Sequence, residues 1–258
     1  MAVIELRNVS RHFVADSGVV PAITALDLTV REGEFLCLVG PSGCGKSTLL
    51  NLIAGFERPD SGSVLVDGVV VEKPGPERFV IFQEPALFPW LNVRRNVAFG
   101  LKVAGLSQPE QDGRVNELLQ LVHLSRFADA WIHELSGGMK QRVALARALA
   151  LDPAILLMDE PFAALDAQTR DLLHEEMEQI WQRTGKTIIF VTHNVREAVR
   201  LGTRVILMSP HGGSISREYP IDLPRNRFLE DFDVARIASV IRDDLRREAM
   251  QAGEGGSP

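Results

Sequence analysis

The residues from Gly40 to Thr48, which read GPSGCGKST, have the types and spacing needed to hold a chain of phosphates. Glycines let backbone N–H groups converge on phosphate oxygens, Lys46 can reach the β- and γ-phosphates, and the hydroxyl of Ser47 can bind Mg²⁺. The segment follows the apolar run FLCLV and opens the helix-like STLLNLIAGF, as this mechanism requires. The sequence therefore predicts a nucleotide site formed by Gly40, Pro41, Ser42, Gly43, Cys44, Gly45, Lys46, Ser47 and Thr48.

Two acidic residues and one histidine follow apolar runs further along the chain. Asp159 and Glu160 come at the end of ILLMDEP, and His193 follows FVT. Parallel sheets hold their ligands at the carboxyl ends of the strands, so we expect these side chains near the phosphates. Asp159 is a candidate to bind Mg²⁺ or to hold its ligands, and Glu160 a candidate to polarise the attacking water. One carboxylate could be an ion pair and a lone histidine is often structural, but the shared placement favours a catalytic set.

The stretch LSGGMKQR, residues 135–142, predicts a second anion site. Ser136 is a good N-cap, and Gly137 and Gly138 leave the N–H groups of the first helical turn accessible. The alternative is an ordinary capped helix. Because one domain has little use for two phosphate cradles, we expect this one to serve a nucleotide bound to another copy of the chain.

Hydrophobic periodicity indicates the elements that position these residues. The N-terminal part alternates as strands do, and Asp67-Gly68 between two β-branched runs predicts a hairpin. The pattern is helical from about 93 to 150, and a further helix over 168–184 stops at Gly185. Short apolar runs between helices predict buried parallel strands. The fold class expected is α/β, with a parallel sheet, a strand-rich N-terminal part and a helical insertion at about 86–150.

Length and composition are those of a globular chain, with 258 residues, 45% hydrophobic and 24% charged. We expect one domain over 1–245, and a disordered, glycine-rich tail over 246–258. The formal net charge of −6 gives no basic field for nucleic acid or an anionic membrane surface. Two cysteines make no disulfide framework. No window approaches the ~18 apolar residues of a spanning helix, so we expect any membrane crossing to be made by another chain.

The phosphate loop, LSGGMKQR, ILLMDEP and VTH, in this order and spacing, resemble the ATP-binding cassette subunits of ABC transporters. The resemblance covers nearly the whole chain. It implies a P-loop NTPase fold with a RecA-like parallel core, an N-terminal antiparallel β subdomain and an inserted α-helical subdomain. It also implies a head-to-tail homodimer that binds ATP and Mg²⁺, each ATP lying between the phosphate loop of one copy and residues 136–138 of the other.

Further roles come only from this resemblance. Gln83, in VIFQEP, matches a glutamine that contacts Mg²⁺ or the attacking water, and Asp166, in FAALDA, matches a loop that crosses the dimer interface. His193 matches the histidine at the γ-phosphate, although Asn194 follows it where aspartate is usual. Phe13 falls where an aromatic ring stacks on adenine, but it could equally belong to the core.

Within the family, PGPERFVIFQ, LFPWLNV and LPRNR look most like the importer branch that serves nitrate, sulfonates and taurine, and taurine subunits above all. This implies permease chains in the membrane and a periplasmic or lipid-anchored solute-binding protein as partners. It also implies a peripheral location on the cytoplasmic face of the inner membrane. Residues 84–95 would receive a permease helix, with Phe88, Pro89 and Trp90 as apolar anchors, unless they only pack the helical insertion.

Two other classes share part of this pattern. A lipid or lipoprotein exporter subunit has the same motifs, because hydrolysis motifs do not encode the direction of transport. A DNA-repair ATPase of related type needs a long coiled coil between the phosphate loop and LSGG. Fewer than a hundred residues separate Gly40 from Ser136, so the sequence disfavours the repair class.

Overall fold

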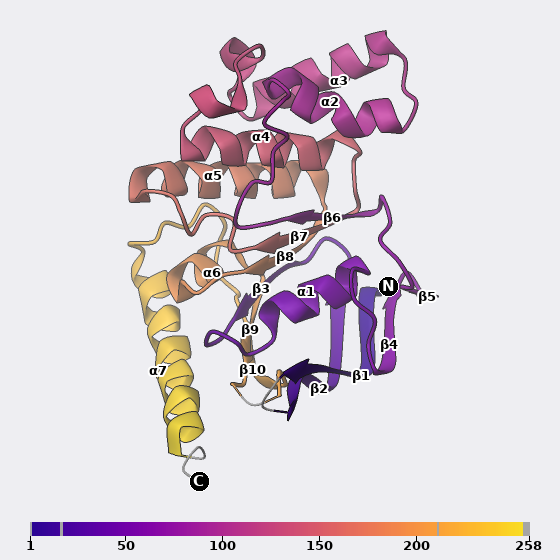
Figure 1. The fold of residues 1–258 in the computed structure, drawn as a ribbon. Helices are drawn as coiled ribbons and strands as arrows, with labels where there is room; N and C mark the ends of the chain where they lie inside the picture. The colour runs from indigo at the N-terminus through magenta and orange to yellow at the C-terminus, as the bar shows by residue number, and fades with distance from the viewer. Residues whose placement is uncertain (1, 16–17, 211, 255–258) are drawn as a thin grey trace. The chain divides into compact units, whose positions relative to one another are not determined.

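The computed structural model describes residues 2–15, 18–210 and 212–254, and the chain forms two compact units (Figure 1). The first unit combines Met1–Gly75 with Thr184–Pro258, and the second is Pro76–Arg183. The second unit is larger than the helical insertion predicted at 86–150, because it also contains two strands and the helix predicted over 168–184.

An antiparallel sheet lies in the N-terminal part of the first unit. It contains β1 (Ala2–Ala15), β2 (Gly18–Arg31), β4 (Ser61–Val66) and β5 (Val69–Val70), in the order β2-β1-β4-β5. The turn between β4 and β5 has positive φ at Asp67 (49°) and at Gly68 (78°). Because this backbone suits Asp-Gly and matches the twist of a hairpin, the hairpin is confirmed.

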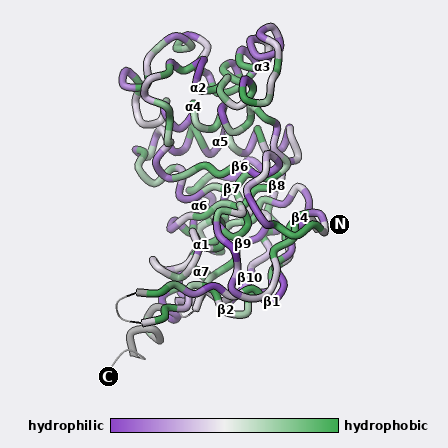
Figure 2. The backbone as a smooth tube through the Cα atoms, turned by 45° about the vertical axis from the view of Figure 1, so that its right-hand side comes forward, coloured by the Kyte–Doolittle hydropathy of each residue, from purple (hydrophilic) through white to green (hydrophobic). Residues whose placement is uncertain are grey.

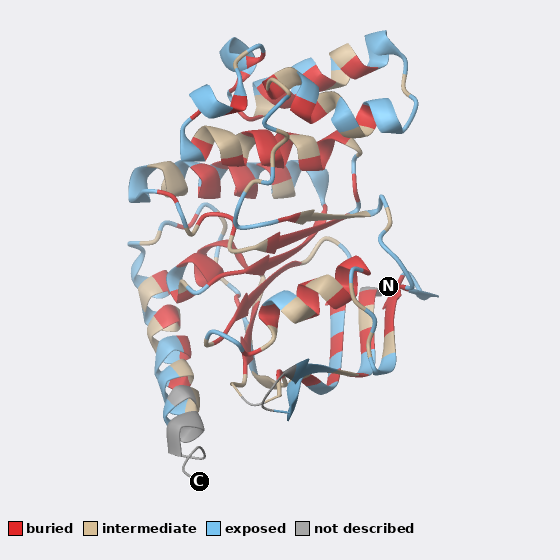
Figure 3. Ribbon diagram, in the orientation of Figure 1, coloured by how far each residue is buried: buried red, intermediate tan, exposed pale blue. Residues whose placement is uncertain are grey.

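The remaining strands of the first unit form a sheet segment whose order is β10-β9-β3-β8. They are β3 (Phe35–Val39), β8 (Thr187–Val191), β9 (Arg204–Met208) and β10 (Ile215–Pro220). β3 runs parallel to both β8 and β9, and every residue of β3 and β8 is buried (Figure 3). The tube at β8 is largely hydrophobic in colour (Figure 2). Leu38 pairs with Val191, so β3 and β8 end at the same edge of the sheet.

The helices described in the first unit are α1 (Lys46–Ala54), α6 (Val195–Leu201) and α7 (Phe232–Glu254). α1 follows β3 and α6 follows β8, while α7 packs against α6. α7 extends beyond the boundary at 245, so the predicted tail is helical as far as Glu254. Its residues are mostly good helix formers, which explains the extension. The last part of the predicted tail, 255–258, lies outside the described residues.

The second unit pairs β6 (Arg78–Ile81) with β7 (Ile155–Asp159) in parallel. Its helices are α2 (Val93–Val103), α3 (Gln108–Leu121), α4 (Gly137–Ala150) and α5 (Ala167–Thr184), with short 3₁₀ turns at Ser125–Phe127 and Ile132–Glu134. α4 contacts α2, α3 and β6, which explains why most of its residues are buried. α5 confirms the helix predicted over 168–184. Within the described part of the chain, no helix has the length and apolarity needed to cross a membrane.

Candidate nucleotide site

The phosphate loop lies in the first unit, between the end of β3 and the start of α1. Gly45 is the N-cap of α1 with φ 95°, and a Cβ added there would lie 2.3 Å from the carbonyl oxygen of Ala22. A side chain on Gly40 would meet Cys44 Sγ at 2.7 Å. Gly45 is therefore required both for its backbone conformation and for space, and Gly40 is required for space.

Lys46 is the first residue of α1 and is folded back over this loop. Its side chain is largely enclosed, since the residue is 8% exposed. Nζ donates to the carbonyl oxygens of Gly40 (2.9 Å) and Pro41 (2.8 Å), and lies 3.7 Å from Cys44 Sγ. The ammonium is thus held among the loop residues at a helix N-terminus, which is where phosphate oxygens are bound in sites of this kind. Ser47 follows and is exposed.

The two cysteines are not reactive thiols in this setting. Burial raises the pKa of the Cys44 thiol, and neighbouring Lys46 only partly opposes that effect. Burial raises the pKa of Cys37 on β3 well above its ordinary value. A thiol with a raised pKa carries little thiolate near neutral pH, so neither residue is suited to be a nucleophile.

His193 and Phe13 also belong to the first unit. The backbone N–H of Thr192 donates to the carbonyl of Leu38 (3.2 Å), which fixes the end of β8 beside the strand that leads into the phosphate loop. His193 comes next and is exposed. Phe13 is 38% exposed, and the guanidinium of Arg11 lies 4.9 Å from the centre of its ring. Phe13 is therefore not a core residue, and the core interpretation that the sequence left open is wrong.

Asp159 and Glu160 lie in the second unit, where Asp159 ends β7 and Glu160 follows it. Glu160 has φ 45°, a conformation that side chains other than glycine rarely adopt. Such strain is often found at functional positions. Gln83 is exposed two residues after β6, and its backbone carbonyl accepts a hydrogen bond from Gln141 Nε2 on α4 (2.8 Å).

The LSGG stretch also lies in the second unit and begins α4. Ser136 is the N-cap, and its hydroxyl accepts from the N–H of Met139 (3.3 Å). Ser136 and Gly137 are exposed, while Gly138 is buried against α5: a Cβ on Gly138 would lie 2.3 Å from Thr169 Cγ2. The predicted N-cap is thus confirmed, and Ser136 and Gly137 at the start of α4 are accessible.

Asp166 lies near Gly138 at the start of α4, because its carboxylate is hydrogen-bonded to Thr169. One carboxylate oxygen accepts from the N–H of Thr169 (2.9 Å) and the other from its hydroxyl (2.7 Å). These bonds hold the pKa of the Asp166 carboxyl below its usual value. The second unit therefore brings Gly138, Thr169 and Asp166 together, although no sequence pattern singles out Thr169.

Comparison with known proteins identifies this arrangement. The ABC transporter family model matches residues 23–163. The chain is 50% identical over 221 residues to the nitrate import ATP-binding protein NrtD of Synechocystis sp., covering 86% of this chain and 83% of that protein. It is 48% identical over 244 residues to the taurine import ATP-binding protein TauB of Pseudomonas syringae pv. tomato, covering 95% and 91%.

The chain belongs to the ABC transporter family. A solved ATP-binding cassette, a dimer in a post-hydrolysis state bound to ADP and Pi, is 33% identical, with a TM-score of 0.75 over 86% of this chain and 100% of that one. The predicted family and fold class are therefore confirmed. The chain is an ATP-hydrolysing cassette of a transporter.

In this ABC cassette the segment after Gln83 is held by α4. Arg147 donates to the carbonyls of Pro85 (3.0 Å) and Ala86 (2.9 Å), and its guanidinium lies 5.4 Å from the Phe88 ring centre. Burial lowers the pKa of Arg147. The sequence did not single out Gln141 or Arg147. The available signal was that both are polar residues on a helix rich in alanine and leucine.

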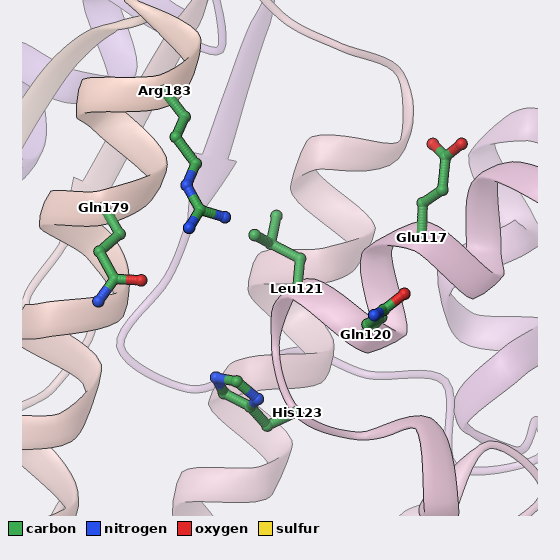
Figure 4. A pocket seen from close by; sticks show the side chains of 6 residues that line it. All are labelled: Glu117, Gln120, Leu121, His123, Gln179 and Arg183. Carbon is green, nitrogen blue, oxygen red and sulfur yellow. The ribbon is translucent and has the colours of Figure 1, made fainter.

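Two pockets lie within the second unit of the cassette. A groove of about 780 Å³ runs between α2 and the start of α3, and its lining includes Trp90, Arg94, Phe99 and Gln111. A pocket of about 410 Å³ lies where Gln179 and Arg183 of α5 face the end of α3 (Figure 4), lined by Glu117, Gln120, Leu121, His123, Gln179 and Arg183. The latter pocket contains none of the residues predicted to act on ATP.

Proposed function

We propose that this ABC cassette hydrolyses ATP to drive the uptake of a small anion or zwitterion, such as taurine, another sulfonate or nitrate. The observation that carries the nucleotide chemistry is the phosphate loop, with the Lys46 ammonium held at the N-terminus of α1. Import and the class of solute are supported by similarity to relatives named as nitrate and taurine import proteins.

The chemistry of the predicted residues suits ATP and Mg²⁺. Lys46 binds the β- and γ-phosphates, the backbone of residues 40–45 surrounds their oxygens, and the exposed ring of Phe13 stacks on the adenine. Mg²⁺ prefers oxygen ligands, and the residues that would hold it, Ser47, Gln83 and Asp159, each carry a side-chain oxygen. When bound, the ion neutralises charge on the phosphate oxygens. The described residues contain no group of three or more His, Cys, Asp or Glu side chains placed to hold a metal.

Hydrolysis rests on three polar side chains. Glu160 polarises the attacking water and accepts its proton, and Gln83 orients that water. His193 donates a hydrogen bond to the γ-phosphate. The left-handed backbone of Glu160, directly after β7, supports this role, because strained backbone of this kind is often found at functional positions.

A second copy of the chain completes the site in this proposal. Ser136, Gly137 and the N–H groups of the first turn of α4 bind the nucleotide of the partner copy, and Asp166 lies at the interface. The exposure of Ser136, Gly137 and Asp166 supports such a surface. A solved relative described as dimeric supports the homodimer.

The permease chains dock on the second unit. Phe88 packs at a tilt against Trp90 and Phe99, with ring centres 5.6 and 4.5 Å away, and Trp90 remains 68% exposed. Such an exposed aromatic cluster beside a groove suits an apolar helix of a partner. We place the cassette on the cytoplasmic face of the inner membrane, working with a permease and a periplasmic or lipid-anchored solute-binding protein.

Uptake of labelled taurine, a longer alkanesulfonate and nitrate tests this function in a strain that lacks the chain. Loss of uptake of one solute, restored by the wild-type chain and not by Glu160→Gln, is the expected result. Normal uptake of all of them in the deleted strain would contradict the proposed solute class and leave the ATPase chemistry unaffected.

A further inference from the structure

The segment LPRNR, residues 223–227, holds the end of α6. Arg227 is only 4% exposed, which is rare for an arginine unless its donors are satisfied. Two arginines of the segment donate to the carbonyls that end α6: Arg227 Nη1 to Val199 O (2.7 Å) and Gly202 O (3.0 Å), and Arg225 Nη1 to Leu201 O (2.8 Å). These carbonyls have no partner within their own helix, so the arginines act as its C-terminal cap.

The guanidinium of Arg227 is itself fixed by its own segment. Nε donates to the carbonyl of Pro224 (2.9 Å) and Nη2 to the carbonyl of Leu223 (2.9 Å). The planar group is therefore held on one side by the segment and bonded to α6 on the other. A cation at this end also complements the helix dipole.

The other end of α6 holds the loop that carries His193. The side chain of Asn194 accepts from the N–H groups of Arg196 (3.1 Å) and Glu197 (3.4 Å). The Thr192 hydroxyl donates to the Glu197 carboxylate and accepts from the N–H of Asn194 (3.0 Å). His193 thus lies between two residues that are both bonded to the first turn of α6.

We propose that Arg227, assisted by Arg225, is a positioning residue for His193 and acts through α6. The helix is only seven residues long, so a shift at its C-terminal end is carried to its N-terminal turn. Polar bonds fix both ends, so the LPRNR segment contributes to the position of His193 through α6. This inference rests on the proposed role of His193 at the γ-phosphate.

Arg227→Lys is the test, because lysine keeps the charge but cannot reproduce the planar fork that bonds four carbonyls. ATP hydrolysis by the full chain should show a kcat lowered by about tenfold, since small displacements of catalytic groups are costly. KM for ATP should stay within about twofold, because the phosphate loop is untouched. The variant is then combined with His193→Ala in a double-mutant cycle.

The cycle separates positioning from general loss of structure. If Arg227 acts through His193, Arg227→Lys has no further effect in the His193→Ala chain. If the two effects multiply, Arg227 acts elsewhere and the proposal is overturned. A normal kcat for Arg227→Lys overturns it as well. If His193→Ala itself leaves kcat unchanged, the proposed role of His193 has failed, and the positioning role falls with it.

A second variant covers the case in which Arg227→Lys does not fold. Arg225→Lys alters the bond to Leu201 and should give a smaller loss of kcat that is again absent in the His193→Ala chain. An additive loss would contradict the proposal. The matched control is Arg236→Lys on α7, where the side chain is 58% exposed and pairs with Asp233. Its kcat should equal that of the wild type.

Discussion

Glu160 is the residue on which we expect the rate of hydrolysis to depend most directly. Glu160→Gln keeps the shape of the side chain but cannot accept a proton. Turnover should therefore fall at least ~10²-fold, the usual size of general-base help. ATP binding should persist, and the ATP-bound chain should accumulate as a dimer. Steady-state hydrolysis and size-exclusion chromatography with ATP measure both effects, and near-normal turnover would remove Glu160 as the base.

Gly138 carries a structural requirement that the neighbouring glycine lacks. Gly138→Ala places a Cβ 2.3 Å from Thr169 Cγ2, so it should lower the free energy of unfolding by about 1–3 kcal/mol. Adding Thr169→Ser removes that methyl group and keeps the hydroxyl on Asp166, so most of the loss should be recovered. Urea unfolding measures these differences.

Gly137→Ala is the matched control for this prediction. A Cβ on Gly137 would meet only Leu165 Cδ2, at an ordinary 3.6 Å, and alanine favours a helix. Its stability should be equal to or above that of the wild type. If Gly137→Ala and Gly138→Ala lower the free energy of unfolding by the same amount, the contact with Thr169 does not explain why residue 138 is glycine.

At the scale of elements, the sequence predicted those helices and turns whose conformation is set by residues adjacent in the chain. The β4–β5 hairpin followed from Asp67-Gly68, and α5 from its apolar face and Gly185. The bond from Gln141 to the Gln83 carbonyl was not predictable, because it joins residues 58 positions apart and depends on how α4 packs. LPRNR was recognised only as a mark of the importer branch. Its composition suggests a solvated surface, whereas Arg227 is enclosed by carbonyls.

The attachment of α7 to β10 should depend on pH through Asp244. Its carboxylate accepts from the Tyr219 hydroxyl (2.6 Å) and pairs with Arg217 and Arg247. The hydroxyl bond, followed by the two guanidiniums, lowers the pKa of Asp244. A lowered pKa in the folded state stabilises the fold above the ordinary value of about 4, and this contribution is lost as the pH falls through the folded value.

Thermal unfolding of the wild type and Asp244→Asn at several pH values checks this prediction. The wild type should unfold at a higher temperature than the variant from pH 5 to 8. The carboxylate forms ion pairs with Arg217 and Arg247, whereas an uncharged amide at this position does not. The difference should shrink below about pH 4, as Asp244 becomes protonated. A difference that is constant down to pH 3 would show that the carboxylate charge does not hold α7.

At the scale of the whole molecule, we expect the groove beside Trp90 to be needed for transport but not for ATP hydrolysis. Trp90→Glu puts a charge on the exposed aromatic cluster, which an apolar permease helix should not tolerate. Uptake should be lost, while the isolated chain keeps its ATPase activity, because Trp90 has no part in the proposed nucleotide chemistry. Phe232→Glu is the control, since Phe232 is 80% exposed on α7 and lies outside this cluster. Its uptake should be normal. If Trp90→Glu transports normally, the permease docks elsewhere, and if both variants lose uptake, added surface charge is the cause.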